Sequence, residues 1–186
     1  MNTKWIIGAA ARLILLPFYK HKLRRFESML LRARSVQQRA LFSKIERCKD
    51  TDFGRDHNFS RITTIEDFRR EVPISQYDDV APYIAKVSNG QQTALFPETE
   101  QVIAFASTAG TTGRPKIIPI TQSWLREYRR SWEVWGVKAV LDSPKLIGTR
   151  WLQISGPEKI DMTRSGLPIG MVSAITARFQ SALAGC

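Results

Sequence analysis

The sequence predicts a mixed α/β fold, with a helical N-terminal region to about residue 90 and then the beginning of a sheet-containing domain. Three observations predict it. Over residues 23–48, apolar residues recur every three or four positions, the period of a helix buried on one face. Two short apolar runs, 101–106 and 117–120, are typical of strands and flank a loop rich in glycine and threonine. A second helical period follows over 122–141.

The composition is that of a folded protein with a basic N-terminal part. Of the 186 residues, 43% are hydrophobic, which is enough to build a packed core. The formal net charge is +11, and residues 1–50 hold 12 of the 28 Lys and Arg residues but only 3 of the 17 acidic ones. Cys48 and Cys186 make no disulfide framework, and the two histidines add no metal-ligand spacing. We therefore expect no protein-bound metal and a cytoplasmic location.

The segment Trp5–Phe18 is apolar and carries basic residues on both sides. It is shorter than the roughly 20 apolar residues of a membrane span, and Arg12 lies near its middle. The residues that follow it lack the cleavage site of a signal peptide. We expect an amphipathic helix that covers a core. The alternative is a helix with weak contact to a membrane surface, because basic flanks attract anionic lipids.

The helical period from residue 23 to residue 48 predicts one long helix with an apolar stripe. The stripe consists of Leu23, Phe26, Leu30, Ala33, Val36, Ala40, Leu41, Ile45 and Cys48. Arginines between these positions form a basic face, which we interpret as solvated. Nucleic-acid binding is the alternative, but no aromatic residues interleave with the basic ones and no binding motif is present, so we expect no nucleic-acid partner.

Local signals organise the region between residues 50 and 90. Residues 50–60 are rich in turn formers and should end the long helix. Thr64 is a candidate N-cap of a helix to residue 70, with Asp67 three positions on. A second short helix is expected over 77–87, broken or restarted at Pro82.

Thr121 is a candidate N-cap for the helix over 122–141. Its spacing predicts a buried stripe of Leu125, Tyr128, Trp132, Trp135 and Ala139. The same spacing favours core packing of the tryptophans over a role in lining an acyl pocket. A third strand is expected over residues 151–155.

Hydroxyls, glycines and one lysine gather in the loop between the first two strands. They are Ser107, Thr108, Gly110, Thr111, Thr112, Gly113 and Lys116. Glycines let backbone N–H groups converge on an anion, hydroxyls donate to phosphate oxygens, and the lysine adds compact positive charge. The mixture predicts a polyphosphate site, and a plain hairpin turn is the alternative.

Two common nucleotide motifs do not fit this loop. In the G-x-x-x-x-G-K-[ST] motif a lysine follows the second glycine directly, whereas Arg114 and Pro115 follow Gly113 here. The G-x-G-x-x-G motif fails as well, because the loop has only two separated glycines. The loop also leads into a strand, so a helix dipole does not supply its positive potential.

Residues 105–116, Phe-Ala-Ser-Thr-Ala-Gly-Thr-Thr-Gly-Arg-Pro-Lys, resemble the phosphate-binding signature of the acyl-adenylate-forming superfamily. Further blocks narrow the resemblance to the N-terminal part of the Gretchen Hagen (auxin-responsive promoter) family of acyl acid–amido synthetases, as a bacterial-type member. These blocks are residues 51–57, 68–73, 77–84, 118–121 and 166–173. The resemblance extends from about residue 36 to about residue 175.

The resemblance implies an acyl-adenylate-forming ligase that uses ATP with Mg²⁺. The loop residues Ser107, Thr108, Gly110, Thr111, Thr112, Gly113 and Lys116 would hold the phosphates, with Lys116 as the catalytic residue. A small-molecule carboxylic acid would be activated as its adenylate and passed to an amine or a thiol. Residues 91–186 would be the N-terminal part of the adenylation domain, and the family's later motifs are not found. We therefore expect an incomplete fragment, inactive in isolation.

Two other classes stay open. One is a non-catalytic remnant, and the other is a protein whose basic helix associates with a membrane or nucleic acid. Among single residues, His57 is interpreted as a turn-stabilising residue rather than a general base, and the pair Asp78–Asp79 as a solvated pair or helix cap rather than a metal site. Ser155, Gly156 and Ser173 are candidates for the border of the substrate site, by family analogy.

Overall fold

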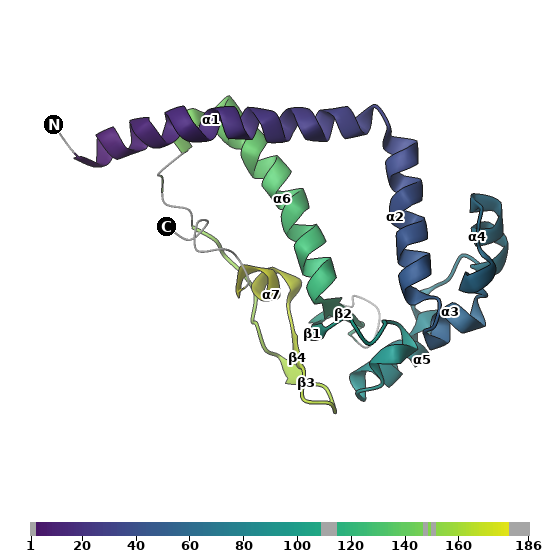
Figure 1. Ribbon diagram of the computed structural model, residues 1–186. Coiled ribbons are helices and arrows are strands. Elements are labelled where there is room, and N and C mark those ends of the chain that lie inside the picture. Colours follow the sequence, from purple (N-terminus) through teal and green to yellow (C-terminus); the bar gives the residue numbers. More distant parts are fainter. Residues whose placement is uncertain (1–2, 109–114, 147–148, 150–151, 179–186) are drawn as a thin grey trace. The chain divides into compact units, whose positions relative to one another are not determined.

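The computed structural model describes residues 3–108, 115–146, 149 and 152–178 and has the mixed α/β fold that the sequence predicts (Figure 1). Its helices are α1 (Thr3–Leu30), α2 (Ala33–Cys48), α3 (Asp52–Asp56), α4 (Ile65–Glu71), α5 (Tyr77–Ser88), α6 (Gln122–Asp142) and α7 (Val172–Arg178). Its strands are β1 (Val102–Ser107), β2 (Ile117–Thr121), β3 (Asp161–Met162) and β4 (Pro168–Gly170). Short 3₁₀ turns are η1 (Phe59–Arg61), η2 (Gln92–Ala94) and η3 (Pro144–Leu146).

The chain divides into two compact units. One comprises Met1–Val36 with Arg126–Ile154, and the other Gln37–Leu125 with Ser155–Phe179. The second unit contains the whole sheet and the helices α3, α4, α5 and α7. The division does not follow chain order, because the chain leaves the sheet-containing unit within α6 and returns to it at Ser155.

The four strands form one mixed sheet in the order β2-β1-β4-β3. β1 pairs with β2 in antiparallel fashion, with Phe105 opposite Pro119 and Ser107 opposite Ile117. On its other edge β1 pairs in parallel with β4, where Ala106 lies opposite Gly170. β3 closes the sheet as an antiparallel neighbour of β4. The first of the two short apolar runs in the sequence is therefore β1, an inner strand of the sheet with a partner on each edge.

Both faces of the sheet are packed. On one face Phe105, fully buried, packs in a cluster with Val102 and with Ile84 and Val87 of α5. On the other face Ala104, Ala106 and Ile120 cluster with Ile175 of α7. Strict alternation would place Val102 on the same face as Ala104, but the register shifts between these two residues. This bulge turns Val102 toward the cluster of Phe105.

The segment before β3 approaches β4 closely at Gly170. A Cβ atom on this buried residue would lie 1.8 Å from the backbone oxygen of Glu158, so no side chain fits there. The neighbouring segment is hydrogen-bonded on both sides of this point, from the Ile160 N–H to the Ile169 oxygen at 2.7 Å and from the Met171 N–H to the Pro157 oxygen at 3.0 Å. The glycine therefore lets residues 157–160 lie directly against β4.

The predicted helix starts around residues 64 and 77 are confirmed by side-chain caps. Thr64 accepts a hydrogen bond from the Asp67 N–H at 3.0 Å, and the Asp67 carboxylate accepts from the Thr64 N–H, which is a complete capping box. At α5 the Asp79 carboxylate accepts from the Gln76 N–H at 2.7 Å. The expected break at Pro82 is wrong, because α5 continues through it. Pro82 and Asp78 are exposed, so water can satisfy the carbonyl that the missing N–H leaves unpaired.

The single helix expected over residues 23–48 is two helices. α1 begins far earlier, at Thr3, and ends at Leu30, and α2 begins at Ala33. At the break the Arg32 N–H bonds to the Met29 oxygen at 3.0 Å, as in a tight turn, and Leu31 is 89% exposed. No glycine or proline marks this position in the sequence. The turn expected at 50–60 likewise contains a short helix, α3, which Thr51 caps by accepting from the Gly54 N–H.

The helix after β2 is confirmed over its full predicted length, but its buried face is smaller than expected. Thr121 caps α6 as predicted, because its hydroxyl accepts from the Trp124 N–H at 3.1 Å. Leu125 is buried, whereas Trp132 and Trp135 are 53% and 56% exposed, so the predicted stripe is wrong at these two positions. Their rings contact each other edge to face at 5.5 Å between centroids. Helical spacing alone does not reveal how far a packing partner extends.

The strand expected over 151–155 is wrong where the structure describes it, because residues 152–155 form no strand. Leu152 and Ile154 are almost fully exposed. The place beside β1 is taken instead by β4, a three-residue strand within the block 166–173. Among the described residues, no helix combines the length and the apolar character needed to cross a bilayer.

We predict that Gly170→Ala lowers the free energy of unfolding by about 1–3 kcal/mol, because the backbone of Glu158 must move to admit a methyl group. Gly136→Ala is the matched control: it lies within α6 with open space around the new Cβ, and should stabilise the protein by about 0.5–1 kcal/mol. Urea denaturation of both variants measures the two effects. A Gly170→Ala variant as stable as the parent protein would contradict the close approach.

Candidate functional site

The loop that the sequence singles out emerges from a closed hairpin base. Ser107 lies opposite Ile117 at the last register position of β1 and β2. One residue further, the Thr108 N–H donates to the Lys116 oxygen at 2.9 Å, and the Thr108 hydroxyl donates to the same oxygen at 3.3 Å. Thr108 and Lys116 are both exposed. The two ends of the loop are therefore held side by side, with a hydroxyl and an ammonium group at its base.

Tyr77, the first residue of α5, fixes the backbone beside Lys116. The Tyr77 hydroxyl lies 3.2 Å from both the nitrogen and the oxygen of Ile117, so it accepts from the N–H and donates to the carbonyl. The Lys116 ammonium lies 5.1 Å from the centroid of the Tyr77 ring, a cation–π distance. The same aromatic residue thus anchors the strand at Ile117 and gives the lysine side chain a defined position.

The end of β4 lies beside the end of β1. Because the two strands are parallel, Thr108 and Met171 follow them at the same edge of the sheet. There the Gly156 N–H donates to the Ser173 hydroxyl oxygen at 3.3 Å. Gly156 and Ser173, both candidates for the border of the substrate site, therefore lie next to each other. Carboxyl ends of neighbouring parallel strands are where α/β sheets commonly bind ligands.

The structure describes three of the seven predicted loop residues. Ser107 is half-buried at the end of β1, and Thr108 and Lys116 form the exposed base of the hairpin. The other four, Gly110, Thr111, Thr112 and Gly113, lie outside the described residues. Sequence reasoning missed Tyr77, although it lies in the block 77–84. Tyr77 continues the apolar stripe of α5 that Val80, Ile84 and Val87 form, and it packs against the same core cluster, so the helical pattern gave no signal of its further role.

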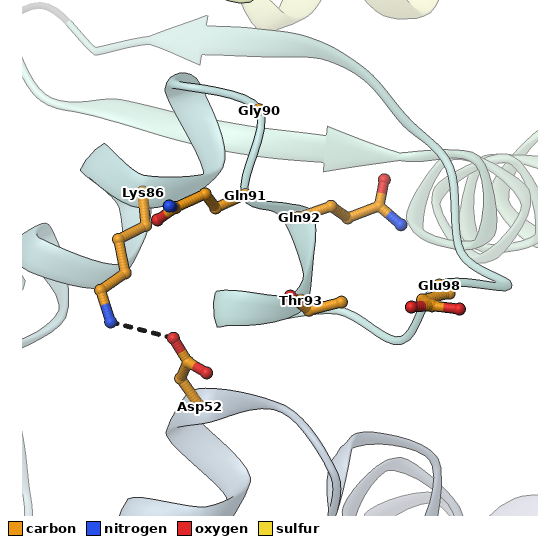
Figure 2. A pocket seen from close by; sticks show the side chains of 7 residues that line it. All are labelled: Asp52, Lys86, Gly90, Gln91, Gln92, Thr93 and Glu98. Atoms are coloured by element: carbon orange, nitrogen blue, oxygen red, sulfur yellow. Dashed lines mark hydrogen bonds and ion pairs between the residues drawn. The ribbon is translucent and has the colours of Figure 1, made fainter.

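An open pocket of about 710 Å³ lies elsewhere in the same unit (Figure 2). It is lined by Asp52, Lys86, Gly90, Gln91, Gln92, Thr93 and Glu98. The Lys86 ammonium donates to the Asp52 carboxylate at 2.9 Å, and this hydrogen bond lowers the pKa of Asp52. Tyr77 and Lys86 are nine residues apart on α5, about 14 Å along its axis. The pocket is therefore separate from the base of the hairpin.

His57 and Asp79 make the contacts expected of a turn-stabilising residue and of a helix cap. The His57 ring nitrogen Nδ1 lies 2.9 Å from the Phe53 oxygen, and its ring stacks on that of Phe53 at 3.9 Å. Asp79 caps α5, as described above. Within the described part of the chain, no group of three His, Cys, Asp or Glu side chains is arranged to hold a metal ion.

The half-buried Cys48 is a separate case, because burial raises the pKa of its thiol.

A family profile described as the GH3 family N-terminal domain matches residues 22–185, most of the chain. The chain belongs to the GH3 family. The family that the sequence blocks indicate is therefore confirmed. The match includes the β1–β2 hairpin, Tyr77 and the segment 166–173.

Curated relatives match a little more than half of the chain. The indole-3-acetic acid-amido synthetase GH3.8 of Oryza sativa subsp. indica is 31% identical over 99 residues, which is 53% of this chain and 16% of that protein. The indole-3-acetic acid-amido synthetase GH3.5 of Arabidopsis thaliana is 27% identical over 107 residues, 57% of this chain and 17% of that protein. The chain thus spans a small part of the length of these relatives. Both are plant proteins and lend no support to the bacterial-type expectation.

A solved structure has the same fold. The GH3.15 acyl acid amido synthetase superposes with a TM-score of 0.71 at 18% identity, over 86% of this chain and 29% of that protein. The helices and strands of the two proteins are therefore arranged alike over most of this chain. At this identity it supports the fold alone.

We predict that Tyr77→Phe destabilises the protein by about 1–2 kcal/mol, because the half-buried Ile117 N–H and carbonyl both lose their partner. The Ile117 amide should then exchange its hydrogen faster. Tyr83→Phe is the matched control: it removes another hydroxyl of α5, which donates to Asp56 at 2.6 Å, away from the hairpin. Hydrogen exchange followed by NMR separates the two variants. Unchanged protection of Ile117 in Tyr77→Phe would contradict the anchoring role of Tyr77.

Proposed function

We propose that this chain forms part of an ATP-dependent acyl acid–amido synthetase and holds the triphosphate of ATP at the β1–β2 hairpin. The observation that carries the proposal is the base of the hairpin, where the exposed residues Thr108 and Lys116 pair through the Lys116 backbone oxygen and the Lys116 ammonium lies over the Tyr77 ring. Membership of the GH3 family supports it, because curated members that match this chain are named amido synthetases.

The donors at the hairpin suit a polyphosphate. The Ser107 hydroxyl can donate to a phosphate oxygen, and the Thr108 hydroxyl can do so once it turns away from the Lys116 oxygen, to which it donates at 3.3 Å. The Lys116 ammonium offsets part of the negative charge. The sequence adds two more hydroxyls and two glycines in the loop itself, at positions 110–113. A loop of this kind brings backbone N–H groups to one anion as well. We therefore assign the phosphate-binding role to Ser107, Thr108, Gly110, Thr111, Thr112, Gly113 and Lys116.

The proposed first step joins two anions, and this is the difficulty that the site must overcome. A carboxylate oxygen of the acid attacks the α-phosphorus of ATP, the bond to the bridging oxygen breaks, and pyrophosphate leaves. Lys116 lowers the repulsion between carboxylate and triphosphate and stabilises the charge that moves to the leaving group. We propose it as the catalytic residue. Tyr77 acts as a positioning residue, since it orients the backbone and the ammonium of Lys116.

The proposed second step transfers the acyl group to an amine. The amine nitrogen attacks the acyl carbon, the bond to AMP breaks, and the nitrogen loses a proton to give an amide. The relatives are named amido synthetases, which favours an amine over a thiol as the acceptor. We place the acid and the acceptor near the shared edge of β1 and β4, where Gly156 and Ser173 lie.

Mg²⁺ would enter this site with the nucleotide. The described residues offer no carboxylate cluster for a metal, so the phosphates themselves would supply its ligands. We further propose that residues 91–186 belong to the adenylation domain and residues 1–90 to a helical region before it. A cytoplasmic location remains our expectation.

We predict that Lys116→Ala weakens ATP binding by about 10- to 100-fold, the usual effect of losing one charge-assisted hydrogen bond. Isothermal titration calorimetry of the chain with ATP and Mg²⁺ measures this. Lys86→Ala is the matched control, because it removes a lysine from the separate pocket in the same unit and should leave the affinity unchanged.

Two outcomes would contradict the assignment. If Lys86→Ala abolished binding and Lys116→Ala did not, the nucleotide site would be the pocket of Figure 2 rather than the hairpin. If the unaltered chain bound no ATP, the hairpin would have no nucleotide role in it. In the longest natural protein that contains this sequence, Lys116→Ala should also abolish carboxylate-dependent exchange of pyrophosphate into ATP.

A further inference from the structure

The first 26 residues combine an apolar segment with a concentrated positive charge. They contain six Lys and Arg residues and no Asp or Glu. Fourteen residues, Trp5–Phe18, are apolar apart from Arg12, and five of the next seven residues are Lys, His or Arg. Apolar and basic residues are thus separated along the helix rather than around it.

This part of the chain lies largely outside the family domain. The family match begins at residue 22, whereas α1 begins at Thr3 and continues without interruption to Leu30. The apolar segment is therefore an extension that the same helix carries beyond the matched domain (Figure 1). The family match does not account for the composition of this extension.

Where the apolar segment ends, an aromatic ring and several cationic groups face solvent. Phe18 is 53% exposed, and Lys20, Arg24 and Arg25 are exposed on the following two turns of α1. The Lys22 ammonium lies 5.1 Å from the centroid of the Phe18 ring and also forms an ion pair with Glu133. An apolar segment followed by exposed basic residues matches the two layers of a bilayer surface, the acyl chains and the anionic headgroups.

The dimensions fit a helix that binds at one surface of a bilayer and does not cross it. Fourteen helical residues extend about 21 Å, against about 30 Å for the hydrocarbon core of a bilayer. We propose that the N-terminal part of α1 docks on membranes that contain anionic lipids, with Trp5–Phe18 entering the headgroup and acyl-chain boundary and with Lys20, Arg24 and Arg25 contacting the headgroups. The inference is independent of the proposed ATP site, which lies in the other compact unit.

Anionic lipid explains these residues better than nucleic acid does. A nucleic-acid surface accounts for the basic residues but leaves the apolar residues of Trp5–Phe18 unexplained. A bilayer accounts for both, because burial of apolar side chains and attraction of basic ones act together. Duplex DNA is therefore a competitor in the test.

We predict that the full chain co-sediments with vesicles of phosphatidylcholine mixed with phosphatidylserine, and much less with vesicles of phosphatidylcholine alone. The triple variant Lys20→Gln, Arg24→Gln, Arg25→Gln should bind the mixed vesicles about a hundredfold more weakly. A second triple variant, Arg126→Gln, Arg129→Gln, Arg130→Gln, is the matched control. It removes the same charge from exposed positions on α6 and should keep most of the affinity.

The apolar contribution has its own pair of variants. Phe18→Ser should weaken vesicle binding about tenfold. Leu31→Ser removes a side chain that is 89% exposed but lies beyond the basic residues, and it should have little effect. Circular dichroism shows whether each variant keeps its helices.

Three results would overturn the proposal: no binding of the full chain to mixed vesicles, equal losses in the two triple variants, or equal effects of Phe18→Ser and Leu31→Ser. Binding to duplex DNA that is tighter than binding to mixed vesicles, with the same dependence on Lys20, Arg24 and Arg25, would replace the membrane by a nucleic acid. ATP titration of the same variants keeps this result separate from the proposed function, since all of them should bind ATP like the parent chain.

Discussion

Pairing of β1 on both of its edges is the constraint from which the sheet-containing unit is built. β2 returns antiparallel on one side, and β4 lies parallel on the other. Because Phe105 is completely buried between these partners and α5, a shift of β1 would disturb every layer of the unit at once. The base of the hairpin at the end of β1, where Ser107 lies opposite Ile117 and Thr108 bonds to Lys116, is consequently held at a fixed place. A rigid strand that presents a polar loop is a usual way to position a binding site.

Signals that act within a few residues were readable from the sequence. The capping residues Thr64 and Thr121, the hairpin strands and the helix after them all depend on neighbours along the chain. The block 166–173 was recognised by resemblance, but its role as the partner strand of β1 was not, since three residues are too few for a periodic pattern. The same pattern of apolar residues made 151–155 look like a strand. In the structure β4 pairs with β1, and residues 152–155 form no strand.

Contacts between distant residues were out of reach of the sequence. Forty residues separate Tyr77 from Ile117, and nothing in the helix pattern around Tyr77 indicates that its hydroxyl bridges a strand. The break at residue 31 has no glycine or proline to announce it. Trp132 and Trp135 are the opposite case, in which the sequence gives a signal that the structure does not follow. Their helical spacing predicts a buried face, but both side chains are exposed in the part of the chain that the structure describes. In each case tertiary packing decides between possibilities that local pattern leaves equal.

The bridge from Tyr77 also has a consequence for association between chains. Ile117 directs its N–H and carbonyl away from β1, toward the tyrosine, and backbone direction alternates along a strand. Pro119 therefore faces the same way, and it has no N–H to offer. At two successive outward positions the outer border of β2 presents no free donor. A strand of another chain would meet no free N–H donors at these positions of the β2 edge. Strand addition by another polypeptide is therefore favoured at the opposite edge of the sheet, beside β3.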